Sequence, residues 1–468
     1  MARVYPFRAL RYNPSRVRIE DVVTQPYDKI TPGMQQKYYG RSPFNLVRII
    51  LGLPELFDND ENNVYTRAAA DFSAWRKSGV LAMENESAIF AYAQRYTVPG
   101  ATGVVRERRG FIALGELYDY AQNVVFRHEQ TLSKPKSDRM NLLRATRAHC
   151  EQIYMLYSDP SYSTEKLLFA GNSVPDLEVT DDYGVSHLLW KVSDANTINM
   201  LCSAMADKKL LIADGHHRYE TALAYRDQVG HPENHTRRRV QGLLPKPAFP
   251  EAAAMMTFVN MDAEGITILP THRTLTGLKN FSPGIFLAQI ARFFKVRRIE
   301  VADPCQITAQ LSAAGSDQIA FAAVTRAGNY LLLGGKTERN ANPRAGSADA
   351  PKEADPDNNL AASLAVALAN IPARQRHLDV AVLHSVVLEQ ILGLTAESIR
   401  QQANVHYLRD AAEAMEQVSS GAADVAFLVN PVTVDQMREI AFAGEVMPQK
   451  STDFYPKLLS GLTIYALD

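Results

Sequence analysis

The sequence has few cysteines, and none are paired at a metal-binding or redox spacing. Its 468 residues include three cysteines, Cys150, Cys202 and Cys305, which lie far apart and form no CxxC. This pattern argues against a zinc ribbon and a disulfide framework, and it is typical of a protein in a reducing compartment. We therefore expect a cytoplasmic protein, and we expect no haem, flavin or zinc.

The sequence also lacks an excess of one charge and any long apolar run. The formal net charge is −1, with 46% hydrophobic and 22% charged residues, which provides no general attraction to nucleic acid or to an anionic membrane. The basic cluster at 106–109 is interpreted as a solvated face. No stretch approaches the roughly 18 apolar residues of a membrane span, and the N-terminus has no apolar core of a signal peptide. We expect neither a nucleic-acid nor a membrane partner.

Two nucleotide-binding signatures are missing as well. The chain contains no GxxxxGK[ST] loop and no set of protein-kinase motifs, so ATP bound in those usual ways is not supported. Helical and strand-like segments alternate along the chain, which predicts a mixed α+β protein. Prolines at 245, 247 and 250 and a polar stretch rich in Pro, Gly, Ala and Asn predict the divisions 1–247, 248–334, a linker at 335–359, and 360–468.

Several local patterns predict helices. Residues 64–78 have amphipathic spacing and are followed by Gly79. Residues 378–392 form a strongly apolar helical pattern, in which His384 is interpreted as a core or interface histidine. Thr433 and Gln436 have the spacing of a capping box.

The most informative stretch runs from Lys208 to Arg226. An apolar run leads into Asp214-Gly215-His216-His217-Arg218, after which apolar residues recur at helical intervals, so the pattern predicts a strand, a tight turn and a helix. The first amides of a helix attract anions, and Gly215 allows close backbone approach. His216, His217 and Arg218 would add donors for a phosphate or carboxylate. Asp214 is open to three interpretations: a metal bridge, a contact to a substrate hydroxyl or amine, or a helix cap.

A second candidate stretch is Phe126 to Cys150. His128 and Glu129 precede three cations, Lys134, Lys136 and Arg139. A carboxylate beside a histidine, followed by cations, would suit a general base that activates a hydroxyl group while the cations hold phosphate oxygens. The alternative is that Glu129 only forms an ion pair with Lys134 or Lys136.

Three further segments could contribute to a site. Tyr27 and Asp28 lie between two prolines, in a stiff loop that either packs structurally or presents polar groups. His272 and Arg273 come at the end of a predicted strand and could converge on the same anion. Near the C-terminus, Lys450, Ser451, Thr452 and Lys457 would suit a lid or a phosphate contact, or else form a solvated loop.

Seven motifs in this order resemble the family catalogued as domain of unknown function 1015, over nearly the whole chain. They are VTQPYD (23–28), RHEQT (127–131), IADGHHRYETAL (212–223), ILPTHR (268–273), LDVAVLH (378–384), ADVAFLVNP (423–431) and MPQKSTDFYPKLLSGL (447–462). The resemblance identifies the chain as a member of that family, whose name assigns no activity.

The strand-DGHHR-helix unit also resembles the phosphate-binding turn of the ParB/sulfiredoxin superfamily, and most of all its free-serine kinases. The resemblance implies a ParB/sulfiredoxin-like core elaborated with further α+β layers. It implies that Glu129 is the base, assisted by His128, that Gly215 to Arg218 hold the phosphoryl group, and that Asp214 contacts the substrate or Mg²⁺. The donor would be pyrophosphate, ADP or ATP. Sulfiredoxins have a cysteine where this chain has His216, which argues against thiol chemistry.

We therefore expect a kinase-like phosphotransferase that acts on free L-serine or a similar small hydroxyl compound. One alternative is a non-catalytic nucleotide-binding regulator of the ParB-like type. Another is a metal-dependent hydrolase built from His128, His216, His217 and His272, although neighbouring residues of a helix point about 100° apart and do not easily chelate one ion. A homodimer is compatible with the sequence, which does not determine the oligomeric state.

Overall fold

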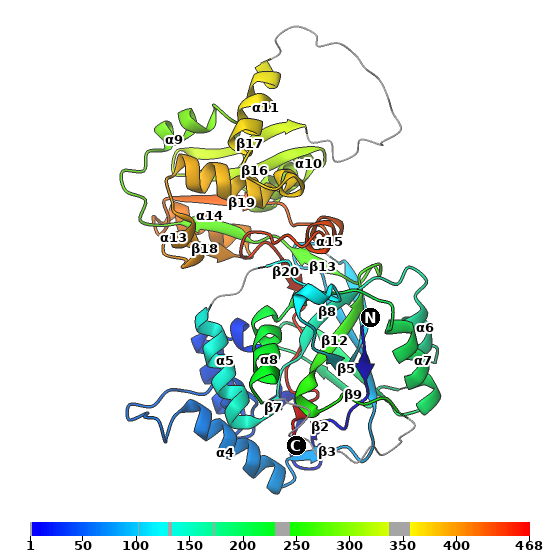
Figure 1. Cartoon of the computed structure of the whole chain (residues 1–468). Helices are drawn as coiled ribbons and strands as arrows, with labels where there is room; N and C mark the ends of the chain where they lie inside the picture. Colours follow the sequence, from blue (N-terminus) through cyan, green and yellow to red (C-terminus); the bar gives the residue numbers. More distant parts are fainter. Residues whose placement is uncertain (1, 102, 130–132, 172–173, 230–243, 337–355) are drawn as a thin grey trace. The chain divides into compact units, whose positions relative to one another are not determined.

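The computed structural model describes residues 2–101, 103–129, 133–171, 174–229, 244–336 and 356–468. The chain divides into two compact units (Figure 1). Unit 1 contains residues 1–127, 131–267 and 454–468, and unit 2 contains residues 128–130 and 268–453. The chain thus leaves unit 1 for three residues after Arg127, and returns to it for its last fifteen residues.

Unit 1 is built on a mixed sheet of nine strands in the described residues. The order is β6-β11-β8-β12-β5-β4-β10-β9, with β1 paired to β5. The pairs β6–β11 and β8–β12 are parallel and the others are antiparallel. The strands of this sheet are β1 (Val4–Tyr5), β4 (Ile89–Thr97), β5 (Val105–Glu116), β6 (Val125–Phe126), β8 (Ile153–Tyr157), β9 (Leu177–Thr180), β10 (Ser186–Val192), β11 (Leu210–Asp214) and β12 (Ala253–Asn260).

Helices pack around this sheet in two groups. Helix α5 packs against α4 and α8, while α6 packs against α7 (Figure 1). The helices of unit 1 are α1 (Ile19–Val22), α2 (Pro32–Arg41), α3 (Val47–Ile50), α4 (Val64–Lys77), α5 (Ser133–Thr146), α6 (Ser163–Leu168), α7 (Ala195–Met205) and α8 (His216–Val229), with short 3₁₀ turns at Tyr27–Lys29, Tyr120–Gln122 and Pro250–Ala252.

The predicted helix at 64–78 is confirmed as α4, and its local chemistry explains its limits. The side chain of Asn63 accepts hydrogen bonds from the amides of Tyr65 and Thr66, and Thr66 completes a capping box. After the last turn, Gly79 has a φ of +73°, a conformation that favours glycine. The apolar face buries Phe72 and Trp75, so both the caps and the packing agree with the sequence pattern.

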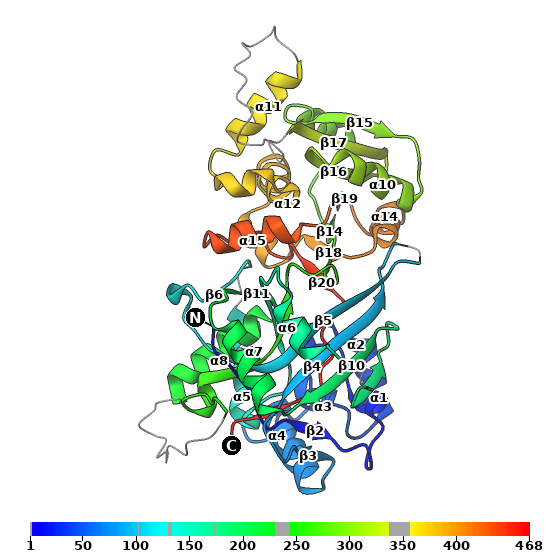
Figure 2. The same ribbon diagram turned by 90° about the vertical axis from the view of Figure 1, so that its right-hand side faces the viewer.

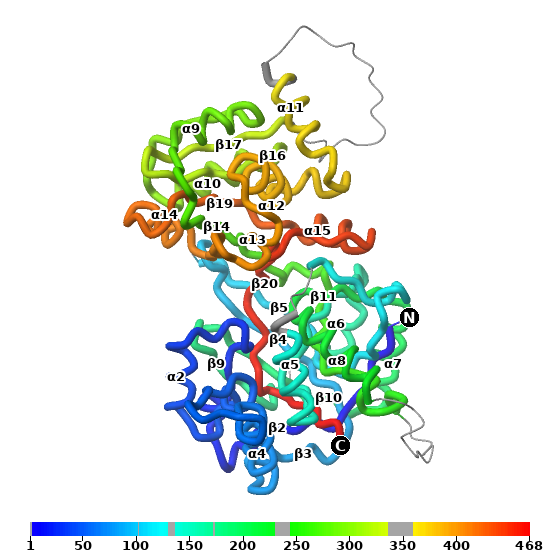
Figure 3. The backbone as a smooth tube through the Cα atoms, turned by 60° about the vertical axis from the view of Figure 1, so that its left-hand side comes forward, coloured from blue at the N-terminus to red at the C-terminus, as the bar shows by residue number. Residues whose placement is uncertain are grey.

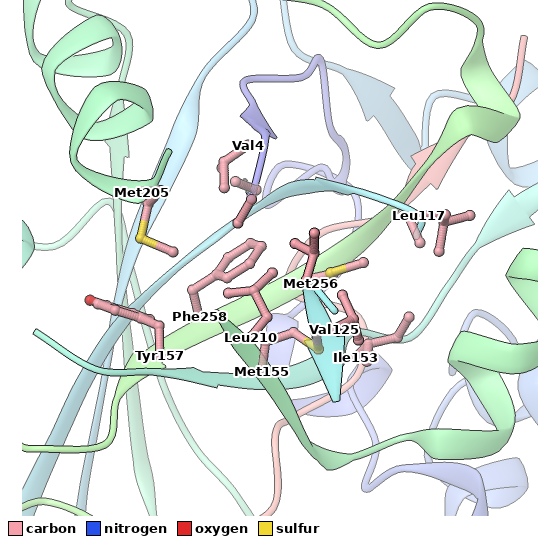
Figure 4. Packing of buried hydrophobic residues seen from close by; sticks show 14 of the residues in the cluster. Val4, Leu117, Val125, Ile153, Met155, Tyr157, Met205, Leu210, Met256 and Phe258 are labelled. Carbon is pink, nitrogen blue, oxygen red and sulfur yellow. The ribbon is translucent and has the colours of Figure 1, made fainter. Parts of the chain in front are cut away.

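The main core of unit 1 lies between the sheet and helices α7 and α8. Phe258 of β12 stacks on Phe111 of β5, with ring centroids 5.0 Å apart. Met155, Met256 and Phe258 are fully buried there (Figure 4). Removing side chains of this size from water is the largest stabilising contribution to such a unit, on the order of 2 kcal/mol for each large apolar residue. This core holds β8, β11 and α8 in fixed positions, and these elements carry the candidate site.

The C-terminal segment is part of unit 1 and appears in red in Figure 3. Ile464 and Leu10 exchange backbone hydrogen bonds, as do Ser460 and Thr24. Four short strands complete the pairings of this region: β2 (Leu10–Tyr12) pairs with β3 (Leu81–Met83), and β21 (Tyr465–Ala466) pairs with β7 (Ala148–His149). The last residues are therefore tied to segments from the start and middle of the chain.

Unit 2 is built on an antiparallel sheet of six strands in the described residues, in the order β15-β17-β16-β19-β14-β18 (Figure 2). Its strands are β14 (His272–Leu275), β15 (Lys295–Ile299), β16 (Gln318–Thr325), β17 (Gly328–Lys336), β18 (Val405–Leu408) and β19 (Val425–Val429). Strands β13 (Thr267–Leu269) and β20 (Asp453–Tyr455) contain the points where the chain passes from one unit to the other.

Two apolar clusters cover the sheet of unit 2, one with α9 and the 379–391 helical segment and one with α10 and α14. The helices of unit 2 are α9 (Pro283–Ile290), α10 (Pro304–Ala314), α11 (Pro356–Ala367), α12 (Asp379–Val382), α13 (Ala396–Arg400), α14 (Ala411–Ser419) and α15 (Val434–Phe442), with a 3₁₀ turn at Ala373–His377 and a π-helix, η6, at Leu383–Ile391. The predicted capping box of Thr433 and Gln436 is confirmed at the start of α15.

The mixed α+β class predicted from the sequence is confirmed by both sheets. The division into units, however, does not follow the chain order expected from the prolines near residue 247. Strand β12 lies after those prolines but inserts between β8 and β5, because its eight buried residues complete the core of unit 1. The linker predicted at 335–359 falls mainly outside the described residues, which include β17 up to Lys336 and α11 from Pro356.

Candidate functional site

The predicted strand, turn and helix are confirmed as β11, Gly215 and α8. Gly215 has a φ of +91°, which L-residues with a side chain rarely adopt. A Cβ atom there would also lie 3.1 Å from the guanidinium of Arg218. The chain therefore turns sharply at the end of a buried strand, and the first amides of the 14-residue helix α8 lie directly after the turn.

Asp214 holds two cations at this turn. Its Oδ1 accepts from the ammonium group of Lys457 at 3.0 Å, and its Oδ2 accepts from Nη2 of Arg218 at 2.9 Å. Only 9% of the Lys457 side chain and 11% of the Arg218 side chain are exposed. Burial alone would raise the pKa of Asp214, but the charges of Lys457 and Arg218 hold that pKa well below its usual range. Asp214, whose side chain is 21% exposed, is therefore a carboxylate ion that organises two positive charges.

Lys457 is positioned by side chains from the sheet. Nε2 of Gln94 donates to the carbonyl of Lys457 at 2.8 Å. The buried guanidinium of Arg108 donates to the carbonyl of Tyr455 at 3.4 Å and to that of Pro456 at 2.5 Å. The sequence predicted Lys457 as part of a lid or a phosphate contact, but it did not predict the pairing with Asp214, because the 243 residues between them leave no local signal.

The loop formed by Pro26, Tyr27 and Asp28 belongs to the same group of charges. The amide of Tyr27 donates to Oε1 of Glu151 at 3.0 Å, and Nη1 of Arg139 donates to Oε2 of Glu151 at 3.4 Å. The guanidinium of Arg139 also lies 3.9 Å from the centroid of the Tyr27 ring. Burial raises the pKa of Glu151, although the positive charges of Arg218 and Arg139 oppose this shift.

The charges around Arg218 connect the loop to the turn. Burial would lower the pKa of Arg218, but the charges of Glu151, Asp214 and Asp28 outweigh it, and the pKa is raised. We call the seven residues involved the unit-1 charged cluster: Tyr27, Asp28, Arg139, Glu151, Asp214, Arg218 and Lys457. Four of the segments predicted to matter therefore converge within unit 1, and Glu151 is the member that sequence reasoning missed.

His128 and Glu129 belong to unit 2, where they contact the C-terminal loop. Nε2 of His128 lies 2.8 Å from Oγ1 of Thr452, and the carbonyl of His128 accepts from the amide of Met447 at 2.8 Å. The amide of Lys450 donates to Oε1 of Glu129 at 3.3 Å. The pair of His128 and Glu129 and the loop at 449–452 were predicted as separate candidate segments. In the structure they are hydrogen-bonded to each other.

Arg273 lies beside these residues in unit 2. Its Nη2 donates to the carbonyl of Lys450 at 3.1 Å, and its Nη1 donates to the carbonyl of Thr271. Burial lowers the pKa of Arg273 to about 10, although the charges of Tyr407 and Glu129 oppose the shift. His272 precedes it in β14, so the two side chains point to opposite faces of the sheet. Nδ1 of His272 accepts from the amide of Val429 at 3.3 Å.

The other candidate cations and hydroxyls have different surroundings. Lys136 forms an ion pair with Glu220 of α8 in unit 1, which Arg127 also contacts. The side chain of Lys134 lies outside the described residues. Oγ of Ser451 donates to the carbonyl of Pro448. His216 is buried and His217 is half-buried in the first turn of α8.

Two further kinds of feature are absent from the described residues. Among the described residues, no group of three His, Cys, Asp or Glu side chains could hold a metal ion. Within the same part of the chain, none of the helices combines the length and the apolar character that crossing a membrane requires.

Comparisons with solved structures show similarity at low identity. A conserved hypothetical protein from Pyrococcus furiosus is 13% identical, with a TM-score of 0.31, covering 72% of this chain and 89% of its own. A free serine kinase variant in complex with AMP is 12% identical, with a TM-score of 0.33, covering 77% and 90%. SbnI with a C-terminal truncation, from Staphylococcus aureus, is 9% identical, with a TM-score of 0.31, covering 75% and 85%.

A comparison with curated proteins found no match. The family model described as "Protein of unknown function (DUF1015)" matches residues 4–381. This match spans well over half of the chain, and the protein therefore belongs to the DUF1015 family.

Proposed function

We propose that the protein is a small-molecule phosphotransferase whose phosphoryl donor binds at the turn between β11 and α8. The observation that supports this most directly is the pair of buried cations, Arg218 and Lys457, held on Asp214 at the start of a helix. Helix N-termini attract phosphate through their unpaired amides, and buried cations strengthen that attraction because water screens them little. Gly215 leaves the backbone open to a close approach by phosphate oxygens.

Asp214 has a positioning role in this proposal. Each of its two oxygens already has a cation partner, so the residue does not fit a Mg²⁺ ligand without losing one of them. We therefore do not assign Mg²⁺ to Asp214. The carboxylate instead keeps two positive charges close together, where the developing charge of a transferred phosphoryl group needs them.

The acceptor side of the reaction follows from the motif resemblance. Glu129 is the proposed base: its carboxylate takes the proton of the acceptor hydroxyl, the hydroxyl oxygen attacks phosphorus, and the bond from phosphorus to the leaving phosphate or nucleotide breaks. The proposed acceptor is free L-serine or a similar compound, and the proposed donors are pyrophosphate, ADP and ATP. Because Glu129 belongs to unit 2, its role is tested by activity and is not inferred from its position.

The test is incubation of the purified full-length chain with L-serine and each donor, followed by detection of O-phosphoserine. We expect product with at least one donor. We expect Glu129→Gln to abolish product while calorimetry shows unchanged donor binding. Glu300→Gln is the matched control, since this residue of unit 2 is 82% exposed and the change should leave the rate unaltered.

The assay also separates the competing functions. Absence of phosphorylated product with every donor contradicts the phosphotransferase. Donor binding without transfer, together with unchanged binding in Glu129→Gln, would instead support a nucleotide-binding regulator.

A further inference from the structure

A buried arginine in unit 2 has an unusual set of neighbours. Arg273 is 1% exposed and lies in the middle of β14, paired in register with Tyr407 of β18 and Phe427 of β19. Residues paired across strands share a face of the sheet, so the guanidinium lies among aromatic side chains. Burial of a cation is costly unless it is paired and hydrogen-bonded.

Arg273 retains hydrogen-bonding capacity in this setting. A guanidinium has five N–H donors, and the partners of Arg273 are the two carbonyls of Thr271 and Lys450. Its Nε is buried and has no hydrogen-bond partner among the described residues. Nε and the adjacent Nη2 form the edge of the guanidinium that binds a carboxylate with two parallel hydrogen bonds.

Two more buried polar atoms accompany this arginine. The guanidinium carbon of Arg273 lies 5.4 Å from the centroid of the Tyr407 ring. The hydroxyl of Tyr407 and Nε2 of His384 are both buried without a hydrogen-bond partner in the part of the chain that the structure describes. Helix η6, which contains His384, packs in the same apolar cluster as Tyr407 and Phe427, the two residues paired in register with Arg273. Burial and the charge of Arg273 together lower the pKa of His384 to about 3.

The backbone around His384 is unusual as well. Residues 378–392 were predicted as a regular helix, but the structure has a π-helix from Leu383 to Ile391 that contains His384. π-Helical turns are rare and are frequently found at functional sites. Native proteins satisfy nearly all buried polar atoms, so three such atoms around one cation point to a ligand that would complete them.

We propose that Arg273, Tyr407 and His384 bind the carboxylate group of a small organic acid. This inference rests on the proposed phosphotransferase function, in which the acid is the acceptor itself. Such an acceptor is an α-amino or α-hydroxy acid such as serine or glycerate. This replaces the role of phosphate ligand predicted for Arg273.

The charge of the site favours a carboxylate over a phosphate. Arg273 supplies one positive charge, and His384 is neutral at neutral pH because its pKa is about 3. The negative charge of Glu129 already acts on this guanidinium, so a carboxylate with a single charge fits here better than a phosphate dianion, which would bury a larger uncompensated charge. The Tyr407 hydroxyl and the neutral His384 ring can add hydrogen bonds without adding charge.

The experiment compares ligands with and without the carboxylate. Calorimetry on the full-length chain would use L-serine and D-glycerate, and then serinol and glycerol, which replace the carboxylate with a hydroxymethyl group. We expect at least one acid to bind, about 10-fold or more tightly than its carboxylate-free counterpart. Tyr407→Phe removes only a hydroxyl and should weaken binding of that acid about 5- to 10-fold, as should His384→Gln.

A matched control and a fold check complete the design. Tyr330→Phe removes an exposed hydroxyl in the same unit, bonded to the carbonyl of Ala327, and should leave binding unchanged. Arg273→Lys should abolish binding of the acid, and its melting temperature shows whether the variant is folded. If it is not, Tyr407→Phe and His384→Gln decide the question.

The outcomes separate the two proposals. Equal binding of an acid and its carboxylate-free counterpart, or no effect of Tyr407→Phe and His384→Gln, overturns the carboxylate site. Inorganic phosphate that displaces the acid and is itself weakened by Tyr407→Phe would show a phosphate site instead, and also overturns it. Acid binding that depends on Tyr407, without phosphorylated product from any donor, supports the carboxylate site and contradicts the phosphotransferase.

Discussion

Nζ of Lys457 lies 3.0 Å from Oδ1 of Asp214, although 243 residues separate them in the chain. The other carboxylate oxygen of Asp214 accepts from Arg218 at 2.9 Å. Because one half-buried carboxylate holds both cations, removing either a cation or the carboxylate should alter the binding of anions at the turn.

Loss of the lysine should weaken donor binding. Lys457→Met removes one of the two cations at the turn, and we expect the affinity for pyrophosphate or ADP, whichever binds the wild-type chain, to fall about 10- to 100-fold in calorimetric titrations. Lys37→Met is the control, because Lys37 is 60% exposed and pairs with Asp182. Equal affinity of Lys457→Met and wild type would contradict donor binding at this turn.

Loss of the carboxylate should destabilise the fold in a way that anions reverse. Asp214→Asn leaves Arg218 and Lys457 buried without their counter-charge, which should cost roughly 3 kcal/mol of unfolding free energy. Added pyrophosphate should raise the melting temperature of this variant more than that of wild type, since it restores negative charge at the turn. Asp182→Asn is the control: Asp182 also contacts two cations, Lys37 and Arg41, but these are more exposed, so its loss should have a small effect.

Asp159 should make unit 1 sensitive to strong acid. It accepts hydrogen bonds from the hydroxyls of Ser163 and Ser161, each at 2.7 Å. Burial alone would raise its pKa, but these donors lower the pKa of Asp159 to about 2. The folded pKa lies below the unfolded value, so this stabilisation, up to about 2 kcal/mol, is present above about pH 4 and is lost as the pH falls toward 2.

Denaturant unfolding at several pH values would test this contribution. Asp159→Asn should be less stable than wild type at neutral pH, and the difference should shrink between about pH 4 and 2. Asp207→Asn is the control, since that side chain is 79% exposed. A difference that does not change with pH would show that hydrogen bonds, without the charge, account for the effect.

His384 should cause a separate loss of stability at mildly acidic pH. Burial and the charge of Arg273 lower its pKa to about 3, so the unfolded chain binds a proton below about pH 6.5 that the folded chain does not. Stability contributed by the neutral ring is complete above that pH and decreases as the pH falls, by about 2 kcal/mol at pH 5.

We therefore expect the melting temperature of His384→Gln to fall less than that of wild type between about pH 6.5 and 5. His406→Gln replaces an exposed histidine of the same unit and should follow the wild-type curve. Parallel curves for His384→Gln and wild type would contradict the low pKa.

Gly110 should be required by the close packing of β5 on β12. A Cβ atom there would press into the backbone carbonyl of Phe258 and lie 2.8 Å from Cγ2 of Val259. Since the backbone contact cannot be relieved by a rotamer change, Gly110→Ala should cost about 3 kcal/mol in unfolding free energy. Gly40→Ala, in helix α2, meets nothing within 4 Å and should be neutral or stabilising by about 0.5–1 kcal/mol. Equal stabilities of the two variants would contradict this packing.

Local features of the chain could be predicted from its residues. The apolar run before Asp214, Gly215 and the helical spacing after it predict β11, the turn and α8, since all three depend on neighbours in sequence. The caps of α4 and α15 are similarly local. In contrast, an α-helix and a π-helix of nine residues bury similar patterns of apolar residues. The pattern around His384 therefore predicted a regular helix, whereas the structure has a π-helix.

The sequence by itself determined the mixed α+β class, the family and the strand-turn-helix form of the DGHHR turn. Only the tertiary structure decided which distant groups meet: Lys457 with Asp214, Glu151 with Tyr27 and Arg139, and Tyr407 with Arg273. The physical reason is that turns and caps depend on adjacent residues, whereas a buried ion pair forms where packing of the whole core brings two strands of the chain together. Sequence spacing contains no record of that packing.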